Sequence, residues 1–400
     1  MNKYYQTEKF KAILNTYEEL QQGNIGGFLD AEELTDIAEY YHYKGMMKEM
    51  MDTLNYTINI FPGAVAPIVL KARVELFHNH NLKAAQNLAE EVEDTNDMEY
   101  IYLIAETLLY QDKASEANAF INEHYSQLSD NAERDEYATE IASFFLDYSK
   151  PELAKRWLDK VMKKDTDYYK ETNARLLKEE GKYEESEDIY NHLLDNNPYA
   201  SEYWNELAQS QILHKDYNGA VTSSEYAIAI NPEDDDAILN KATALFALNN
   251  YEEALKYYLR YKELVPFGDT SSVDITIGHI LLSMEDEEKA KEYFEHGYMI
   301  SEDKPTTMIH IAISTFENGY TSYAYDILKT IIGNCEEKWK LGYGYLARCC
   351  YELMKEDEFK KYLAIAVERN PEESTDLLGD LFPEGTEPKD YPTTPLLEFI

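Results

Sequence analysis

The hydrophobic and polar positions of this chain follow a helical period, and the pattern itself recurs. Between residues 168 and 266, apolar residues lie three and four positions apart in two successive stretches, and a proline then ends each pair of stretches. Three of these prolines, Pro198, Pro232 and Pro266, stand 34 residues apart. A fixed period of this length predicts stacked helical hairpins.

The middle copy shows how one unit folds. Trp204, Leu207 and Ala208 share one face of a first helix. Ala220 and Ala227 share one face of a second helix, where small side chains allow two backbones to approach closely. A following Asn-Pro pair ends that helix, because proline cannot continue it. Each unit is therefore expected to be a helix, a short turn and an antiparallel helix.

This unit resembles the tetratricopeptide repeat. The family's signature positions are held by Trp204, Leu207, Ala208, Ala220, Ala227 and Pro232, whereas Gln211 and Ser224 stand where a larger apolar residue is usual. The resemblance implies an all-α fold, a right-handed superhelical solenoid of about ten stacked antiparallel helix pairs with capping helices at both ends. It also implies that the first helix of each pair lines a concave groove, and that the chain is a non-catalytic protein-interaction scaffold.

The same phase extends over most of the chain and predicts its organisation. Residues 1–30 are expected to form an N-terminal capping helix and linker, and residues 372–382 a C-terminal capping helix. Residues 383–400 hold four of the twelve prolines, which predicts an extended or disordered tail. The solenoid spans 31–371, with units that start near residues 31, 65, 98, 135, 167, 201, 235, 271, 305 and 340.

Two unlike sets of side chains fall on the predicted groove. Early units place carboxylates there: Glu32, Asp36, Glu39, Glu99, Glu106, Glu136, Glu140, Glu202 and Glu206. Late units place a mostly apolar set there, which we predict to be the partner-binding site: Leu239, Asn240, Phe246, Ile275, His279, Leu282, Ile309, His310, Ile313, Phe316, Tyr345, Arg348 and Tyr351. Exposed apolar side chains in one row favour a binding surface. The alternative is a register error of one residue, which would return some of them to the interior.

Charge narrows the choice of partner. The net charge is −40, from 77 acidic and 37 basic residues. A surface of this sign repels nucleic acid and anionic membrane, so neither is expected as a partner. Acidic peptides are disfavoured for the same reason. A protein or peptide that is basic or apolar-aromatic suits the groove better.

The compartment is predicted from what the sequence lacks. It contains no apolar run of about 18 residues, and its start does not resemble a secretion signal. Cys335, Cys349 and Cys350 have no metal-ligand or redox spacing. These features favour the cytoplasm.

Candidate chemistry is weak everywhere in the sequence. His78 and His80 are close enough to share a metal ion, but no carboxylate or thiolate has fitting spacing, and a polar turn is the simpler interpretation. The Gly342-Tyr343-Gly344 triplet lacks a phosphate-loop continuation and fits a helix. We therefore expect no catalytic residue, no metal site and no cofactor, and the chain is not predicted to be an enzyme.

Two functions remain open at this point. The first is an interaction module that holds a peptide or helical segment of another protein in its groove. The second is a self-assembling or autoregulated structural protein, in which Phe399 and Ile400 of the tail occupy the late groove of the same chain or a second copy.

Overall fold

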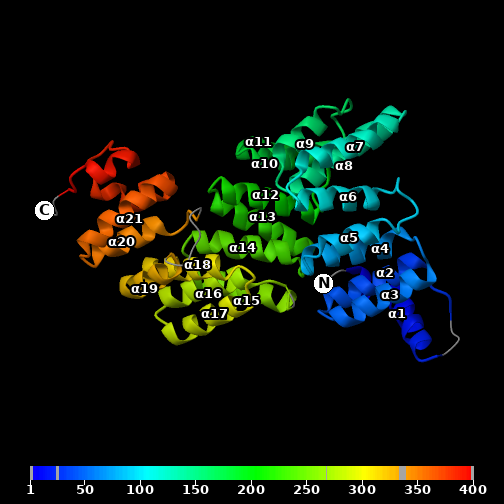
Figure 1. The fold of residues 1–400 in the computed structure, drawn as a ribbon, viewed down its shortest axis with the longest axis horizontal. Helices are drawn as coiled ribbons and strands as arrows, with labels where there is room; N and C mark the ends of the chain where they lie inside the picture. The colour runs from blue at the N-terminus through cyan, green and yellow to red at the C-terminus, as the bar shows by residue number, and fades with distance from the viewer. Residues whose placement is uncertain (1–2, 24–26, 267, 333–338, 398–400) are drawn as a thin grey trace. The chain divides into compact units, whose positions relative to one another are not determined.

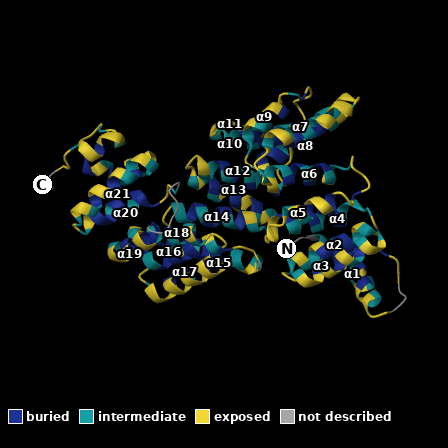
Figure 2. Cartoon of the chain, viewed as in Figure 1, coloured by how far each residue is buried: buried dark blue, intermediate teal, exposed yellow. Residues whose placement is uncertain are grey.

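The computed structural model describes residues 3–23, 27–266, 268–332 and 339–397, and every regular element within them is a helix (Figure 1). The chain divides into two compact units, Met1–Ala244 and Leu245–Ile400, which are described separately below. Buried residues gather where the helices of a unit face one another, and exposed residues cover the outward faces (Figure 2). The predicted all-α class of stacked antiparallel helix pairs is confirmed. The right-handed coiling and the exact number of units stay predictions.

Unit 1 begins with a capping segment and continues as helix pairs. The capping segment consists of η1 (Lys3–Gln6) and α1 (Glu8–Gln21). The pairs are α2 (Ala31–Tyr43) with α3 (Met47–Ile60), α4 (Val65–Arg73) and its π-helical extension η2 (Val74–His78) with α5 (Leu82–Ala89), α6 (Met98–Tyr110) with α7 (Ala114–Gln127), α8 (Asn131–Asp147) with α9 (Pro151–Leu158), α10 (Asp167–Glu179) with α11 (Tyr183–Asn196), and α12 (Ser201–Leu213) with α13 (Tyr217–Ile230). Helix α14 (Asp235–Ala247) crosses the boundary between the units.

Unit 2 continues the same order. It contains α15 (Tyr251–Leu264), the pairs α16 (Ser271–Ser283) with α17 (Glu287–Ile300), α18 (Lys304–Glu317) with α19 (Thr321–Ile332), and α20 (Tyr343–Glu352) with α21 (Glu356–Arg369), and then the short elements α22 (Pro371–Leu378), η3 (Gly379–Leu381) and η4 (Pro388–Thr393). Among the described residues, no helix combines the length and the apolarity that crossing a bilayer requires.

The pair α12–α13 shows why the sequence folds this way. Leu207 and Ala208 of α12 and Ala220 of α13 are buried, as the period of their positions predicts. Trp204 is only half-buried: its ring stacks on Tyr226 with centroids 4.5 Å apart, and its indole N–H donates to a backbone carbonyl 2.9 Å away. The signature tryptophan therefore covers the edge of the pair rather than its centre.

The turn inside each pair uses one residue in the left-handed conformation. Between α12 and α13 this residue is Lys215, with φ of 65°. The next amide, of Asp216, donates to the carbonyl of Gln211 over 2.8 Å, which ends α12 in a Schellman motif. The corresponding residues of the other pairs are Gly45, His80, Asp112, Ser149, Gly181, Asn249, Glu285, Gly319 and Met354.

The capping segment of unit 1 lies where the sequence predicts a cap. Phe10, Ile13 and Tyr17 of α1 are buried and share a core with residues of α2. Helix α2 then begins with a capping box, in which the Asp30 carboxylate accepts from the Glu33 amide over 2.8 Å and the Glu33 carboxylate accepts from the Asp30 amide over 3.2 Å.

The C-terminal cover is larger than the sequence predicts. Helix α22 buries Leu378, as expected of a capping helix. Beyond it, Tyr391 of η4 is buried and stacks on Phe382 with ring centroids 4.1 Å apart, and the Leu397 amide donates to the Leu381 carbonyl over 2.9 Å. The prediction of an extended or disordered tail is therefore wrong for the described residues 383–397. Phe399 and Ile400 lie outside the described residues.

The Gly342-Tyr343-Gly344 triplet starts a helix rather than continuing one. Gly342 has φ of 83° and is the N-cap of α20. The Glu373 carboxylate of α22 accepts from the Gly342 amide over 3.1 Å and from the Gly344 amide over 2.7 Å. A carboxylate at a helix N-terminus satisfies amides that have no partner inside the helix. This contact fastens the C-terminal cover to the last helix pair.

Candidate functional site

The first helices of unit 1 form a hollowed face, which we call the acidic inner face. Its first hollow has a volume of about 560 Å³ and is lined by α2, α4, residues 64 and 97, and Glu99 of α6. The carboxylates that line it are Glu32, Asp36, Glu39, Asp97 and Glu99, and its one basic side chain is Arg73. Of the early carboxylates predicted for α2 and α6, Glu32, Asp36, Glu39 and Glu99 line this hollow, and Glu106 does not.

A second hollow lies beside the first and shares Arg73 with it. Its volume is about 530 Å³, and residues of α4, α6, α8 and α10 line it together with Tyr148, the C-cap of α8. Its carboxylates are Glu106, Glu140 and Asp147. Aromatic side chains form much of the remaining wall: Tyr102, Phe144, Tyr148 and Tyr168.

Crowding of like charges perturbs the titration of the acidic inner face. Partial burial is the largest cause of the raised pKa of Glu39, and the negative charges of Asp36 and Glu99 add to it, while Arg73 opposes them. Burial, followed by the charge of Glu140, raises the pKa of Tyr168 to about 12. Burial is thus the main cause of both shifts, and neighbouring negative charges add to it.

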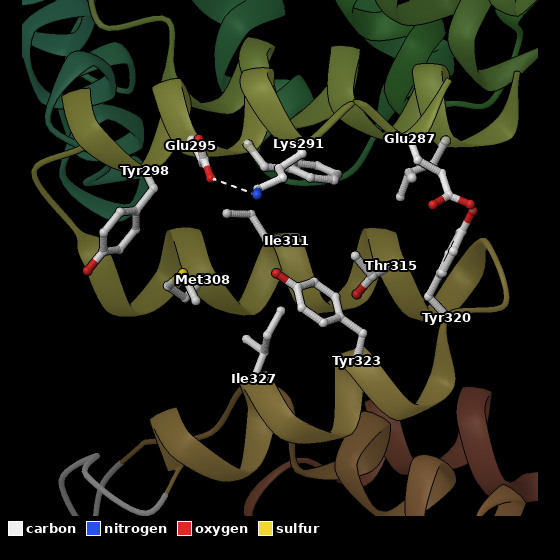
Figure 3. Close-up of a pocket in the computed structure, with 12 residues that line it drawn as sticks. Glu287, Lys291, Glu295, Tyr298, Met308, Ile311, Thr315, Tyr320, Tyr323 and Ile327 are labelled. Atoms are coloured by element: carbon white, nitrogen blue, oxygen red, sulfur yellow. Dashed lines mark hydrogen bonds and ion pairs between the residues drawn. The ribbon is translucent and has the colours of Figure 1, made fainter. Parts of the chain in front are cut away.

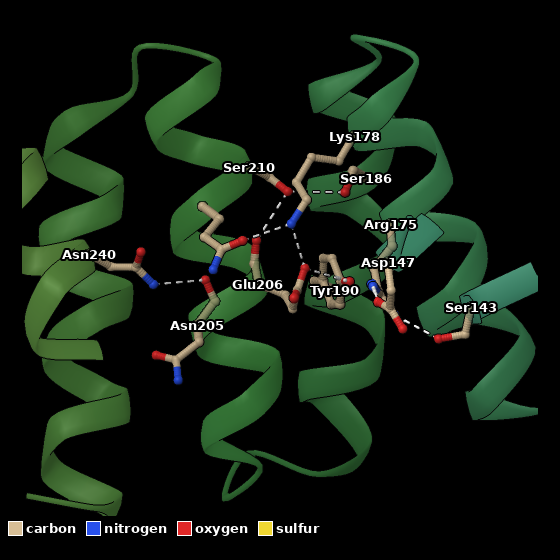
Figure 4. Close-up of polar contacts among 11 residues, drawn as sticks. Ser143, Asp147, Arg175, Lys178, Ser186, Tyr190, Asn205, Glu206, Ser210 and Asn240 are labelled. Carbon is tan, nitrogen blue, oxygen red and sulfur yellow. Dashed lines mark hydrogen bonds and ion pairs between the residues drawn. The ribbon is translucent and has the colours of Figure 1, made fainter. Parts of the chain in front are cut away.

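Ion pairs and hydrogen bonds join successive first helices of this face (Figure 4). Arg175 of α10 donates to Asp147 of α8 over 2.5 Å and to the Ser143 hydroxyl over 2.8 Å. Lys178 of α10 donates to Glu206 of α12 over 2.7 Å. These contacts set the spacing between the helices that line the face.

The Asn240 side chain also takes part in the contacts between successive first helices. It is buried, and its amide donates to the Asn205 carbonyl over 3.3 Å. The prediction that Asn240 lines a partner-binding groove is therefore wrong, because its amide already serves helix packing. Leu239, the neighbouring predicted residue, is half-buried.

Unit 2 carries a row of aromatic side chains on its first helices. Phe246 of α14 meets the His279 ring of α16 edge-on, with centroids 5.3 Å apart. Phe316 of α18 meets Tyr345 of α20 edge-on at 5.8 Å. Burial lowers the pKa of His279, which favours a neutral imidazole in this row. Six of the predicted residues remain half-buried and close to a surface on α14, α16, α18 and α20: Phe246, His279, Leu282, Ile313, Phe316 and Tyr345.

Four other predicted residues of unit 2 behave differently from this row. Ile309 is fully buried and Ile275 is 6% exposed, so both belong to the interior and the groove prediction is wrong for them. Arg348 is already engaged, because it donates to the Asp380 carboxylate over 2.6 Å and to the Leu377 carbonyl over 3.2 Å. His310 is exposed.

Tyr351, the last of the predicted set, packs against the second helix of its own pair. It is half-buried, and its ring centroid lies 5.5 Å from that of Phe359 in α21.

A further cleft lies between α17, α18 and α19, and the sequence did not predict it (Figure 3). Its volume is about 580 Å³, and its floor is apolar: Leu282, Phe294, Met308, Ile311 and Ile327. Tyr298, Tyr320 and Tyr323 form part of the rim, where the Tyr320 hydroxyl donates to Glu287 over 2.6 Å. The sequence has an unusually high number of tyrosines, 35, which could have indicated an aromatic cleft. The count does not show which tyrosines lie together in the fold.

Candidate chemical sites gain no support from the geometry. Within the described ranges, no three histidine, cysteine or carboxylate side chains are grouped as metal ligands would be. His78 and His80 lie at the turn before α5, where Tyr110 approaches the His80 ring nitrogen at 3.3 Å. Cys349 and Cys350 are buried, and burial raises the pKa of the Cys350 thiol to about 11, which disfavours the reactive thiolate. Cys335 lies outside the described residues.

Comparison with known proteins identifies the repeats. Two family models, both described as tetratricopeptide repeat, match residues 211–267 and 275–304, which span the region from the end of α12 to α17. No curated protein matches the chain.

Several solved structures are similar. A tetratricopeptide repeat protein from Parabacteroides merdae is 16% identical, with a TM-score of 0.47 over 66% of this chain and 98% of its own. MamA from Desulfovibrio magneticus, from residue 41 to its end, is 18% identical, with a TM-score of 0.38 over 44% of this chain and 98% of its own. The Cut9–Hcn1 hetero-tetramer of APC/C contains a chain that is 14% identical, with a TM-score of 0.41 over 92% of this chain and 86% of its own.

Proposed function

Because this chain is a tetratricopeptide-repeat protein, we propose that it is a non-catalytic scaffold whose first-helix faces bind a peptide or helical segment of a partner protein. Stacked repeats present extended surfaces that are suited to this task. The proposal needs no cofactor.

The acidic inner face carries the proposal. Eight carboxylates line its two hollows, against the single guanidinium of Arg73. A partner segment rich in lysine or arginine would be attracted to this surface. Burial and then the charges of Asp36 and Glu99 raise the pKa of Glu39, and a cation of the partner would offset those charges. The net charge of −40 acts in the same direction and disfavours nucleic acid and anionic membrane.

The aromatic row of unit 2 supplies a second contact of a different kind. Phe246 and Phe316 are half-buried, so part of each aromatic side chain stays in contact with water. An apolar or aromatic side chain of the partner would cover this area, and aromatic residues are enriched in such contacts. A segment that binds unit 1 is therefore expected to be basic, and one that binds unit 2 is expected to be apolar-aromatic.

The alternative, self-assembly through the C-terminal tail, has less support. Residues 388–393 pack against α21 of their own chain, and the Leu397 amide is bound to the Leu381 carbonyl. The tail up to residue 397 thus covers the end of its own solenoid. Localisation in the cytoplasm remains part of the proposal.

Binding of labelled peptides to the full chain tests the proposal. Three peptides of equal length, one rich in lysine and arginine, one rich in aspartate and glutamate and one neutral and aromatic, are titrated by fluorescence anisotropy at low and high salt. We expect the basic peptide to bind, and to bind less tightly as salt rises. The acidic peptide should not bind.

Matched variants locate the contact. Glu32→Gln with Glu39→Gln, both in the first hollow, should weaken the basic peptide about fivefold. Glu91→Gln with Glu123→Gln makes the same charge change at exposed residues outside the acidic inner face and should leave binding unchanged. Equal binding of the acidic and basic peptides, or an equal loss in both double variants, would contradict the proposal.

The aromatic peptide tests unit 2. Phe246→Ala with Phe316→Ala should weaken it about tenfold, because aromatic anchors contribute strongly when they are covered. Leu259→Ala, at an exposed position of α15, is the matched control.

A further inference from the structure

Among the described residues of unit 1, positively charged side chains link three pairs of neighbouring first helices: α4 with α6, α8 with α10, and α10 with α12. Arg73 of α4 donates from Nε to Glu106 of α6 over 2.9 Å. Arg175 links α10 to α8, and Lys178 links α10 to α12. Between α6 and α8, no such ion pair forms among the residues that the structure describes.

Neutral groups occupy the step between α6 and α8 instead. The Tyr102 ring of α6 stacks on Phe144 of α8 with centroids 5.0 Å apart and planes 14° from parallel. Burial, followed by the charge of Glu140 of α8, raises the pKa of the Tyr102 hydroxyl. A neutral hydroxyl near a carboxylate does not cancel its charge.

Glu140 differs from the other two carboxylates of the second hollow in its ion pairing. The hollow contains three carboxylates, of which Glu106 is paired with Arg73 and Asp147 with Arg175. In the described chain no lysine or arginine forms an ion pair with Glu140. Its negative charge instead contributes to the raised pKa values of Tyr102, Tyr137 and Tyr168.

The walls of the hollow indicate which cation fits. Phe144 and Tyr168 line it beside Glu140, and Tyr168 is 42% exposed, so its ring can be reached from solvent. A guanidinium can lie flat on an aromatic ring and donate two parallel hydrogen bonds to a carboxylate. An ammonium is more strongly hydrated and cannot make both contacts with the same geometry.

We propose that the hollow between α6 and α8 receives an arginine side chain of the partner segment, with Glu140 as its hydrogen-bond acceptor and the Tyr168 ring as its stacking surface. This inference rests on the function proposed above and specifies one residue of the partner. The arginine would place a cation between α6 and α8, next to the links that Arg73 and Arg175 form on either side.

Two labelled peptides, octa-arginine and octa-lysine, test the proposal on the full chain. Their equal charge cancels the general attraction to the acidic inner face, so a difference reports arginine recognition. Glu140→Gln should weaken octa-arginine about tenfold, the loss expected for a charge-assisted pair. Glu123→Gln, the same change on the exposed surface of α7, should have no effect.

The stacking surface is tested separately. Tyr168→Phe keeps the ring and should retain the binding of octa-arginine, whereas Tyr168→Leu should weaken it severalfold and change octa-lysine much less. Circular dichroism and thermal unfolding establish that each variant is folded.

The outcomes separate the two proposals. If neither peptide binds, or if Glu32→Gln with Glu39→Gln has no effect on either, the proposed function fails. If both peptides bind and respond to that double variant, but Glu140→Gln matches Glu123→Gln, the arginine site alone is refuted. Equal affinity of the two peptides, with equal losses in Tyr168→Leu, also refutes it.

Discussion

Asp274 of α16 is the side chain whose removal should damage unit 2 most specifically. It is fully buried and accepts hydrogen bonds from Lys262 of α15 and, over 2.6 Å, from Nδ1 of His296 in α17. One carboxylate therefore joins three successive helices. Asp274→Ala leaves the Lys262 ammonium without its partner.

The cost follows from the burial of each partner. Removing one member of a buried ion pair typically costs about 3–5 kcal/mol. The Lys262 side chain keeps 22% of its surface exposed and His296 keeps 50%, so both regain water contacts after the change. We therefore expect a loss of about 2–3 kcal/mol.

Hydrogen–deuterium exchange read by mass spectrometry is the suitable assay, because repeat arrays open locally and a single melting temperature averages over them. A loss of this size should speed exchange in α15, α16 and α17 by roughly 30- to 150-fold. Asp274→Asn keeps the shape and one acceptor oxygen, so its effect should be smaller.

Asp326→Ala, at an exposed aspartate of α19, controls for the loss of a carboxylate in the same unit and should not change exchange in these helices. Unchanged protection of α16 in Asp274→Ala would refute the reasoning. Equal acceleration throughout the unit would refute it as well, since the linkage would then not be local.

Three further changes have expected outcomes. Gly278→Ala should lower the melting temperature by the equivalent of about 1–3 kcal/mol, because the added Cβ would lie 2.4 Å from a ring carbon of Phe294; a melting temperature equal to wild type would mean that the ring moves freely. Acidification from about pH 7 to about pH 5.5 should raise the melting temperature. Burial and like charges raise the folded-state pKa values of Glu39, Glu171 and Asp236, so protonation of these groups favours the folded state and this contribution is lost as pH rises through those values. A lower melting temperature at the acidic pH would contradict this prediction. Met354→Gly should stabilise the chain by up to about 1 kcal/mol in urea unfolding, because residue 354 has φ of 57° and is 88% exposed; destabilisation would show that its side chain packs usefully.

The sequence predicted the helix pairs because their determinants are local. Leu207 and Ala208 are buried where a period of 3.6 places them, and the Asp30–Glu33 capping box starts α2 as its spacing indicates. Of the early carboxylates, Glu32, Asp36, Glu39 and Glu99 line the first hollow, whereas Glu106 is 5% exposed and paired with Arg73.

Whether the predicted side chains of the late units are buried or exposed depends on contacts between successive helix pairs, which the sequence does not specify. Ile309 lies 3.4 Å from the position that a Cβ on Gly342 would occupy, so its burial comes from the close approach of the next pair. A rotation of about 100° per residue turns an outward position into a buried one, so a small error in register reverses the prediction. The second hollow needs Tyr102, Glu140 and Tyr168 from three helices, and no local rule brings them together.

The left-handed turn residues have a consequence for how such an array can change. Glycine adopts this backbone geometry without strain, yet Lys215, Glu285 and Met354 hold it with full side chains. A single substitution to glycine at such a turn would remove this backbone strain and stabilise the folded chain. Single substitutions at these turns can therefore stabilise one helix pair at a time without changing the side chains on the helix faces.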